Sequence, residues 1–63
     1  MYRYRLIQDE TGADLGPFVS LRMTFAAGEV IGRRDGERYV VLNVVEPENE
    51  SFRAYIVVRA QRA

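Results

Sequence analysis

Two long apolar runs in the second half of the chain constrain its fold more than any other feature. The first follows Asp35-Gly36 and covers residues 38–45, and the second covers residues 52–60. Both are dense in β-branched and aromatic residues, which suit the pleated, half-buried surface of a strand. The two runs therefore predict a small all-β domain.

Alternating apolar residues predict two strands in the first half of the chain. In residues 2–8, Tyr2, Tyr4 and Leu6 lie on one face, and a period of two is that of a strand. Residues 19–25 alternate more cleanly, and the apolar face expected there is composed of Val19, Leu21, Met23 and Phe25. Both segments are expected to be half-buried strands.

Proline and glycine mark the boundaries between the strands. Pro17 is expected at a strand start or on a sheet edge, because proline cannot donate a hydrogen bond to a ladder. Asp35-Gly36 is typical of a tight type I′ hairpin, which needs positive φ at both central positions. A further short strand at residues 30–31 is followed by Gly32, which indicates a β-bulge or the close approach of another backbone.

These segments predict one domain over residues 1–63 that consists of a five-stranded antiparallel sheet. Strands of this length, joined by short turns, can close into a small barrel that hides its edges. Alternation along the last strand places Phe52, Ala54, Ile56 and Val58 on its inward face. One arrangement of the barrel interior uses Leu42, Val44, Ile56 and Val58. Tyr55 and Val57 then lie on the outward face of the last strand. Tyr39, Val41 and Val45 share one face of the strand before it, and that face is covered by other strands, covered by another chain, or left exposed.

The middle of the chain resembles SH3-like small barrels. It reads Ala27-Gly28-Glu29-Val30-Ile31, then Asp35-Gly36, then Arg38-Tyr39-Val40-Val41-Leu42-Asn43-Val44-Val45. In those modules a glycine–acid pair opens a strand, a tight turn follows, and a long strand has the pattern Tyr/Arg-x-Val-x-x-Val. The whole chain is also similar to a group of short, uncharacterised bacterial proteins that open with Tyr-Arg-Tyr, an acidic turn and Leu-Gly. The resemblance implies a fold and not a function, and the chain lacks the tryptophan that SH3 domains use to bind proline-rich peptides.

The composition excludes the commonest catalytic groups. The chain has no histidine, cysteine or lysine, so it lacks the usual proton-transfer residue, the thiol nucleophile and the Schiff-base amine. Glu46, Glu48 and Glu50 lie in a predicted exposed loop without the spacing of a calcium site. We therefore expect a non-catalytic protein with no cofactor and no metal site.

The arginines suggest a binding face. The chain has nine basic residues, all arginine, and nine acidic residues, so no net charge attracts nucleic acid or an anionic membrane. In a closed barrel the first and last strands can be neighbours, and the candidate binding face then consists of Arg3, Arg5, Arg53, Tyr55 and Arg59. Arginine and tyrosine are favoured at protein interfaces.

Two kinds of partner fit such a face. The zero net charge favours a protein partner or a second copy of the chain. Single-stranded nucleic acid is the alternative, because it binds to aromatic side chains by stacking and to arginines through its phosphates. Carboxylates paired with these arginines would argue against nucleic acid, whereas an unpaired stripe of arginines would favour it.

The sequence gives no sign of a membrane protein. No segment approaches the ~18 consecutive apolar residues of a membrane-spanning helix. The N-terminus has no apolar stretch or cleavage site of a secretory signal. A cytoplasmic location is the default expectation.

Overall fold

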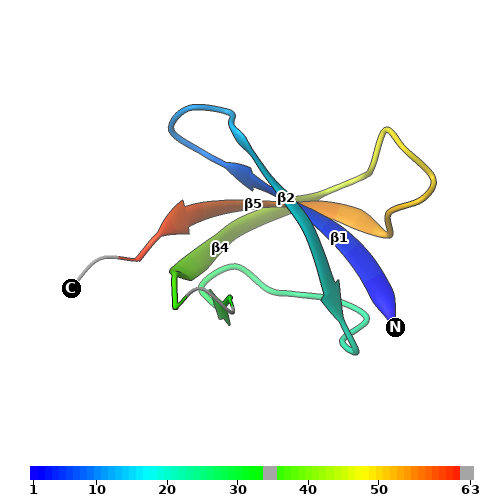
Figure 1. Cartoon of the computed structure of the whole chain (residues 1–63), viewed down its shortest axis with the longest axis horizontal. Coiled ribbons are helices and arrows are strands. Elements are labelled where there is room, and N and C mark those ends of the chain that lie inside the picture. Colours follow the sequence, from blue (N-terminus) through cyan, green and yellow to red (C-terminus); the bar gives the residue numbers. More distant parts are fainter. Residues whose placement is uncertain (34–35, 62–63) are drawn as a thin grey trace.

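A sheet of five strands makes up the structure, a computed structural model that describes residues 1–33 and 36–61 (Figure 1). Along the chain the strands are β1 (Tyr2–Gln8), β2 (Asp14–Ser20), β3 (Val30–Gly32), β4 (Arg38–Val45) and β5 (Ala54–Ala60). In space their order is β2-β1-β5-β4-β3. The described part of the chain contains no helix, and so none that could cross a membrane. The prediction of an all-β chain with five strands is confirmed.

The pairing of β1 with β5 makes the sheet mixed. These two strands run parallel, with Tyr4 opposite Ala54 and Gln8 opposite Val58, whereas the three other pairings are antiparallel. The prediction of a purely antiparallel sheet is therefore wrong. The long connection at residues 21–29 reverses the chain between β2 and β3, so that β5 arrives beside β1 in the same direction.

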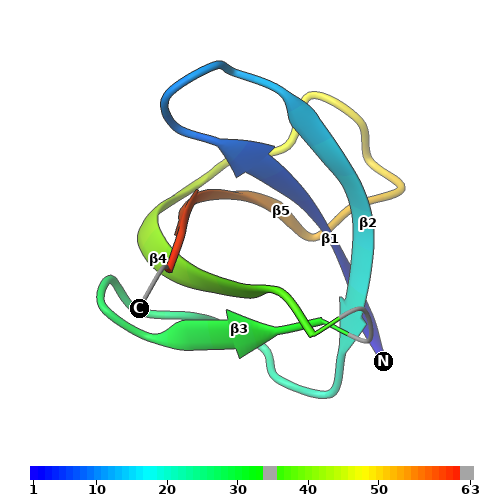
Figure 2. The same cartoon turned by 60° about the vertical axis from the view of Figure 1, so that its left-hand side comes forward.

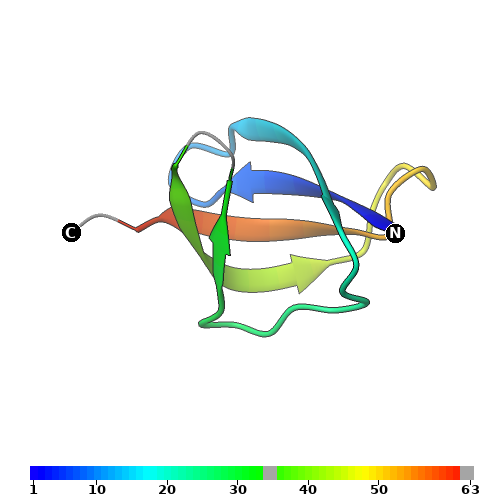
Figure 3. The ribbon, with the colours of Figure 1, turned by 60° about the horizontal axis from the view of Figure 1, so that its bottom comes forward.

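The sheet curls into a half-barrel (Figure 2). Its edge strands, β2 and β3, share no ladder in the described backbone. Residues 21–29 connect these two strands on the concave side (Figure 3), and Phe25 from this connection is buried in the core. Pro17 lies in β2, so its predicted place on a sheet edge is confirmed.

The core fills the concave side of the half-barrel. Its most deeply buried side chains come from β1, β4 and β5 and are at most 1% exposed: Tyr4, Leu6, Val41, Ile56 and Val58. Phe25, Ile31, Tyr39 and Ala54 complete the buried cluster. The predicted inward face of the last strand is therefore confirmed from Ala54 onward.

A bulge in β4 changes which of its residues face the core. The register of β4 against β5 shifts at Leu42, so that Val41 and Val44 both pair with core residues of β5 although they are three positions apart. Such an extra residue interrupts the alternation of a strand. Of the face for which the sequence left the covering open, Tyr39 and Val41 are buried in the core.

The strand predicted over residues 19–25 is displaced toward the N-terminus. β2 ends at the second residue of this segment, and Val19, Leu21 and Met23 are exposed by 47%, 78% and 58%. Phe25 is buried and follows the prediction. The strand that pairs with β1 is β2, which begins five residues before Val19. The position of the strand is therefore set by its pairing with β1 and not by the local alternation of residues 19–25.

Two glycines near β3 differ in what the fold requires of them. Gly36 has a φ of 88°, as expected for a tight turn, while Asp35 of the predicted type I′ pair lies outside the described residues. Gly32 has no positive φ, and the register of β3 shows no bulge there. A Cβ at Gly32 would meet no atom within 4 Å. The predicted bulge at Gly32 is wrong, and no described part of the chain approaches it closely.

Candidate binding face

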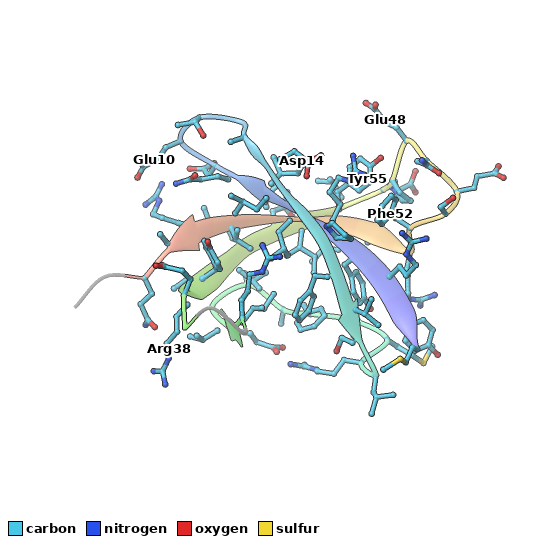
Figure 4. All side chains as sticks on the ribbon, in the orientation of Figure 1. Glu10, Asp14, Arg38, Glu48, Phe52 and Tyr55 are labelled. Carbon is cyan, nitrogen blue, oxygen red and sulfur yellow. The ribbon has the colours of Figure 1, made fainter. Side chains whose placement is uncertain are left out.

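A phenylalanine is buried on the convex side of the sheet, away from the core. Phe52 is 6% exposed, yet it is not a member of the concave cluster. Its ring packs edge-on against Tyr55, with centroids 6.0 Å apart, and both side chains lie on the same side of the sheet (Figure 4). Phe52 was predicted to face inward with Ala54, and this is wrong because the chain bends before β5 begins.

Two arginines of β1 cover the ring of Phe52. The guanidinium carbons of Arg3 and Arg5 lie 5.0 Å and 4.6 Å from its centroid. Arg5 is also the register partner of Tyr55 and lies 6.0 Å from that ring. Cation–π contacts of this kind, together with the apolar stems of the arginines, bury the phenylalanine where no strand covers it.

Carboxylates neutralise part of the positive charge on this side. Arg5 forms an ion pair of 2.8 Å with Asp14, and Arg59 forms ion pairs of 2.9 Å with Asp9 and 3.7 Å with Glu10. Arg3 forms no ion pair with the carboxylates that the structure describes. The charge on the face is therefore concentrated at Arg3.

Arg53 lies apart from the other residues of the predicted face. Its Nε donates a hydrogen bond of 2.7 Å to the carbonyl of Met23. Its guanidinium lies 5.0 Å from the ring of Tyr2, which packs against the concave core. Arg53 therefore ties the connection at residues 21–29 to the sheet and does not extend the convex face.

The convex face also contains two apolar residues, Val57, which the sequence placed outward, and Ile7, which it did not single out. Ile7 pairs with Val57 in the parallel ladder, and both are half-buried. They lie between the Phe52 contacts and Arg59, because the outward residues of β5 are Tyr55, Val57 and Arg59 in order. Ile7 shares the outward face of β1 with the two arginines, and this alternation was the signal that could have identified it. We use the name convex patch for the set Arg3, Arg5, Ile7, Phe52, Tyr55 and Val57.

The resolved pKa shifts belong to contacts that hold residues 21–29, not to the convex patch. Burial raises the pKa of the Tyr4 hydroxyl above 10.0, and this hydroxyl donates a hydrogen bond to the carbonyl of Arg22. Hydrogen bonds from the Arg22 guanidinium and the Ala26 N–H lower the pKa of Glu29. These hydrogen bonds hold the connection at residues 21–29 in place on the concave side.

Nothing beyond the geometry assigns a function to the chain. The residues that the structure describes contain no group of three or more acidic side chains able to hold a metal ion. The chain has no match among protein-family models, curated proteins or solved structures. The convex patch is therefore the feature of the structure that bears on function.

Proposed function

We propose that this chain is a non-catalytic binding module of SH3-like barrel type, and that it contacts another protein through the convex patch. The observation that carries the proposal is the burial of Phe52 beneath Arg3 and Arg5 on the convex face of the sheet. An interface uses aromatic rings, and it uses arginines and tyrosines beside them.

The stacked arginines support this proposal energetically. A free arginine loses rotamer freedom when a partner fixes it, at a cost of about 0.5–1.5 kcal/mol per side chain. Arg3 and Arg5 are already held against Phe52 before any partner arrives. The partner surface that fits the patch is acidic opposite Arg3 and apolar or aromatic opposite Ile7 and Val57.

Single-stranded nucleic acid is the alternative ligand. Arginines beside aromatic rings are the side chains that such ligands use, and Arg3 has no described counter-ion. The ion pairs of Arg5 with Asp14 and of Arg59 with Asp9 weaken this alternative. With zero net charge, they favour a protein partner.

Selection from a displayed library of random peptides tests the proposal. We expect selected peptides to be enriched in acidic and aromatic residues and to shift the amide resonances of the convex patch. Arg3→Glu should weaken this binding at least about tenfold. Arg38→Glu is the matched control, because Arg38 is an exposed arginine at the far end of β4 from Phe52 and Tyr55 (Figure 4). Equal losses for the two variants, or shifts elsewhere on the protein, would contradict the proposal.

Titration with short single-stranded DNA and RNA at two salt concentrations tests the alternative. Phosphate binding must weaken as salt rises. Salt-sensitive shifts at Arg3, Arg5 and Tyr55 would favour nucleic acid over protein, and their absence would remove the alternative.

A further inference from the structure

The hydrogen bonds of β3 toward β4 come from every second residue. The carbonyl of Glu29 accepts a bond of 2.8 Å from the N–H of Val41, and the N–H of Arg33 donates a bond of 2.9 Å to the carbonyl of Glu37. Bonded positions alternate along an antiparallel pair. The backbone N–H and C=O groups of the odd-numbered residues in this segment therefore point toward β4.

Val30 and Gly32 are the even-numbered residues of β3. Their backbone N–H and C=O groups point away from β4. β3 is the last strand of the sheet. No hydrogen bond of the described backbone outside the ladders uses Val30 or Gly32. The edge of β3 thus offers the N–H and the C=O of both residues to another strand.

Gly32 supplies an independent observation at the same edge. Glycine weakens a strand interior, and it often marks a place where another backbone approaches closely. Gly32 has no positive φ, and a Cβ there would meet no atom within 4 Å. Neither the backbone conformation nor the packing of this chain requires a glycine at this position.

We propose that β3 pairs with β3 of a second copy of this chain, antiparallel and about a two-fold axis through Ile31. In this register Val30 of one copy lies opposite Gly32 of the other, and each such pair exchanges both backbone hydrogen bonds. The Val30 side chain, 47% exposed in the single chain, then covers the glycine of the second copy. The same patch serves both copies, as in any isologous dimer.

Charge complementarity identifies the occupant as a second copy. The register that pairs Val30 with Gly32 also sets Glu29 opposite Arg33 of the second copy. Within its own chain Glu29 already pairs with Arg22, and Arg33 already donates to the Leu15 carbonyl, so the contact between copies adds to these interactions and does not replace them. Residues directly opposite in an antiparallel pair have Cβ atoms about 4.5–5.5 Å apart, and opposite charges there are favourable. The symmetry produces this contact twice.

The other edge strand is less suited to such pairing. Pro17 lies in the middle of β2, and proline cannot donate a hydrogen bond to an added strand. The proposed pairing therefore joins β3 to β3 and closes as a dimer. It uses none of the convex patch and is independent of the proposed function.

The dimer should be weak, because a three-residue edge buries less than the roughly 1,000 Å² of a stable interface. We expect a dissociation constant of about 0.1–1 mM, measured by sedimentation equilibrium. Hydrogen exchange followed by NMR locates the contact. The amides of Val30 and Gly32 should exchange quickly in dilute protein and at least about tenfold more slowly when the dimer is populated. The amide of Ile31 should be protected at all concentrations.

Paired charge variants test the register. Val30→Lys with Gly32→Lys sets like charges opposite each other and should abolish the dimer. Val30→Glu with Gly32→Lys sets opposite charges in the same places and should restore it. Both positions are exposed, so these variants should fold. Val19→Lys on β2 is the matched control, since Val19 is also 47% exposed, and it should leave the dimer unchanged.

Three results would overturn the proposal. The first is a protein that stays monomeric at about 1 mM, the upper limit of the expected dissociation constant. The second is a dimer in which the amides of Val30 and Gly32 exchange as fast as in the monomer. The third is a loss of dimer in Val19→Lys equal to that in the double-lysine variant.

Discussion

The guanidinium of Arg33 donates a hydrogen bond of 2.7 Å from Nη1 to the carbonyl oxygen of Leu15. Arg33 follows β3 and Leu15 belongs to β2, so this bond joins the two edge strands of the half-barrel. These strands share no described ladder. A side chain thus makes a connection that backbone pairing would make in a closed barrel.

Replacing Arg33 by alanine should therefore destabilise the fold. Hydrogen bonds to charged groups contribute about 1.5–3 kcal/mol, and we expect the lower end of that range because Arg33 is half-exposed. Urea unfolding followed by tyrosine fluorescence measures the loss. Arg38→Ala, at an exposed arginine, should cost less than about 0.5 kcal/mol. Equal costs for the two variants would show that the Arg33 bond contributes nothing.

Replacing Gly36 by valine should lower the free energy of unfolding by more than about 1 kcal/mol, because a β-branched side chain resists positive φ. Gly36 has a φ of 88°. Gly32→Val is the control in dilute protein, since that position has no positive φ and has room for a Cβ. It should leave stability unchanged or raise it. A thermal unfolding curve of Gly36→Val that matches the wild type would contradict this prediction.

Replacing Val41 by aspartate should unfold the domain. Val41 is fully buried, and an unpaired carboxylate in such a place costs several kcal/mol, most of the stability of a domain this small. Val45→Asp introduces the same charge in the same strand at a position 38% exposed, and it should remain folded. Amide NMR spectra distinguish the two outcomes. A well-dispersed spectrum for Val41→Asp would refute the register described for β4.

The Arg22–Glu29 pair predicts an acid dependence of stability. Hydrogen bonds from Arg22, and then from the Ala26 N–H, lower the pKa of Glu29 below its ordinary value of 4.5. The contribution of Glu29 is therefore present above pH 4.5 and disappears as the pH falls through the lower pKa of the folded state. The difference in unfolding midpoint between the wild type and Glu29→Gln should shrink in acid. A difference that stays constant with pH would show that Glu29 does not stabilise the fold through its charge.

The strands of the second half were predictable because their signal is local. The β-branched runs at residues 38–45 and 52–60 have few alternatives to a strand, and β4 and β5 lie within them. The alternation at residues 19–25 was just as clear, yet most of it lies in a connection. Alternation shows that a segment can be a strand. It does not show that a partner strand is available to pair with it.

The candidate binding face was also predictable in part, because alternation along a strand shows which of its residues share a face. Arg3, Arg5 and Tyr55 lie together because β1 and β5 are neighbours, as expected for a barrel whose first and last strands are adjacent. Arg53 turned to the other side and Phe52 turned outward, since the chain bends just before β5. That bend is not visible in the alternation of the sequence.

Local sequence patterns were enough to predict that this chain forms a small all-β domain, where most of its strands lie, and that β1 and β5 bury alternate residues. These properties follow from side chains a few residues apart, which are encoded locally. Three features became visible only in the folded chain: the parallel pairing of β1 with β5, the bulge at Leu42 and the burial of Phe52 under two arginines. Each of these depends on which distant segments meet, and the free energy of that choice comes from packing across the whole sheet.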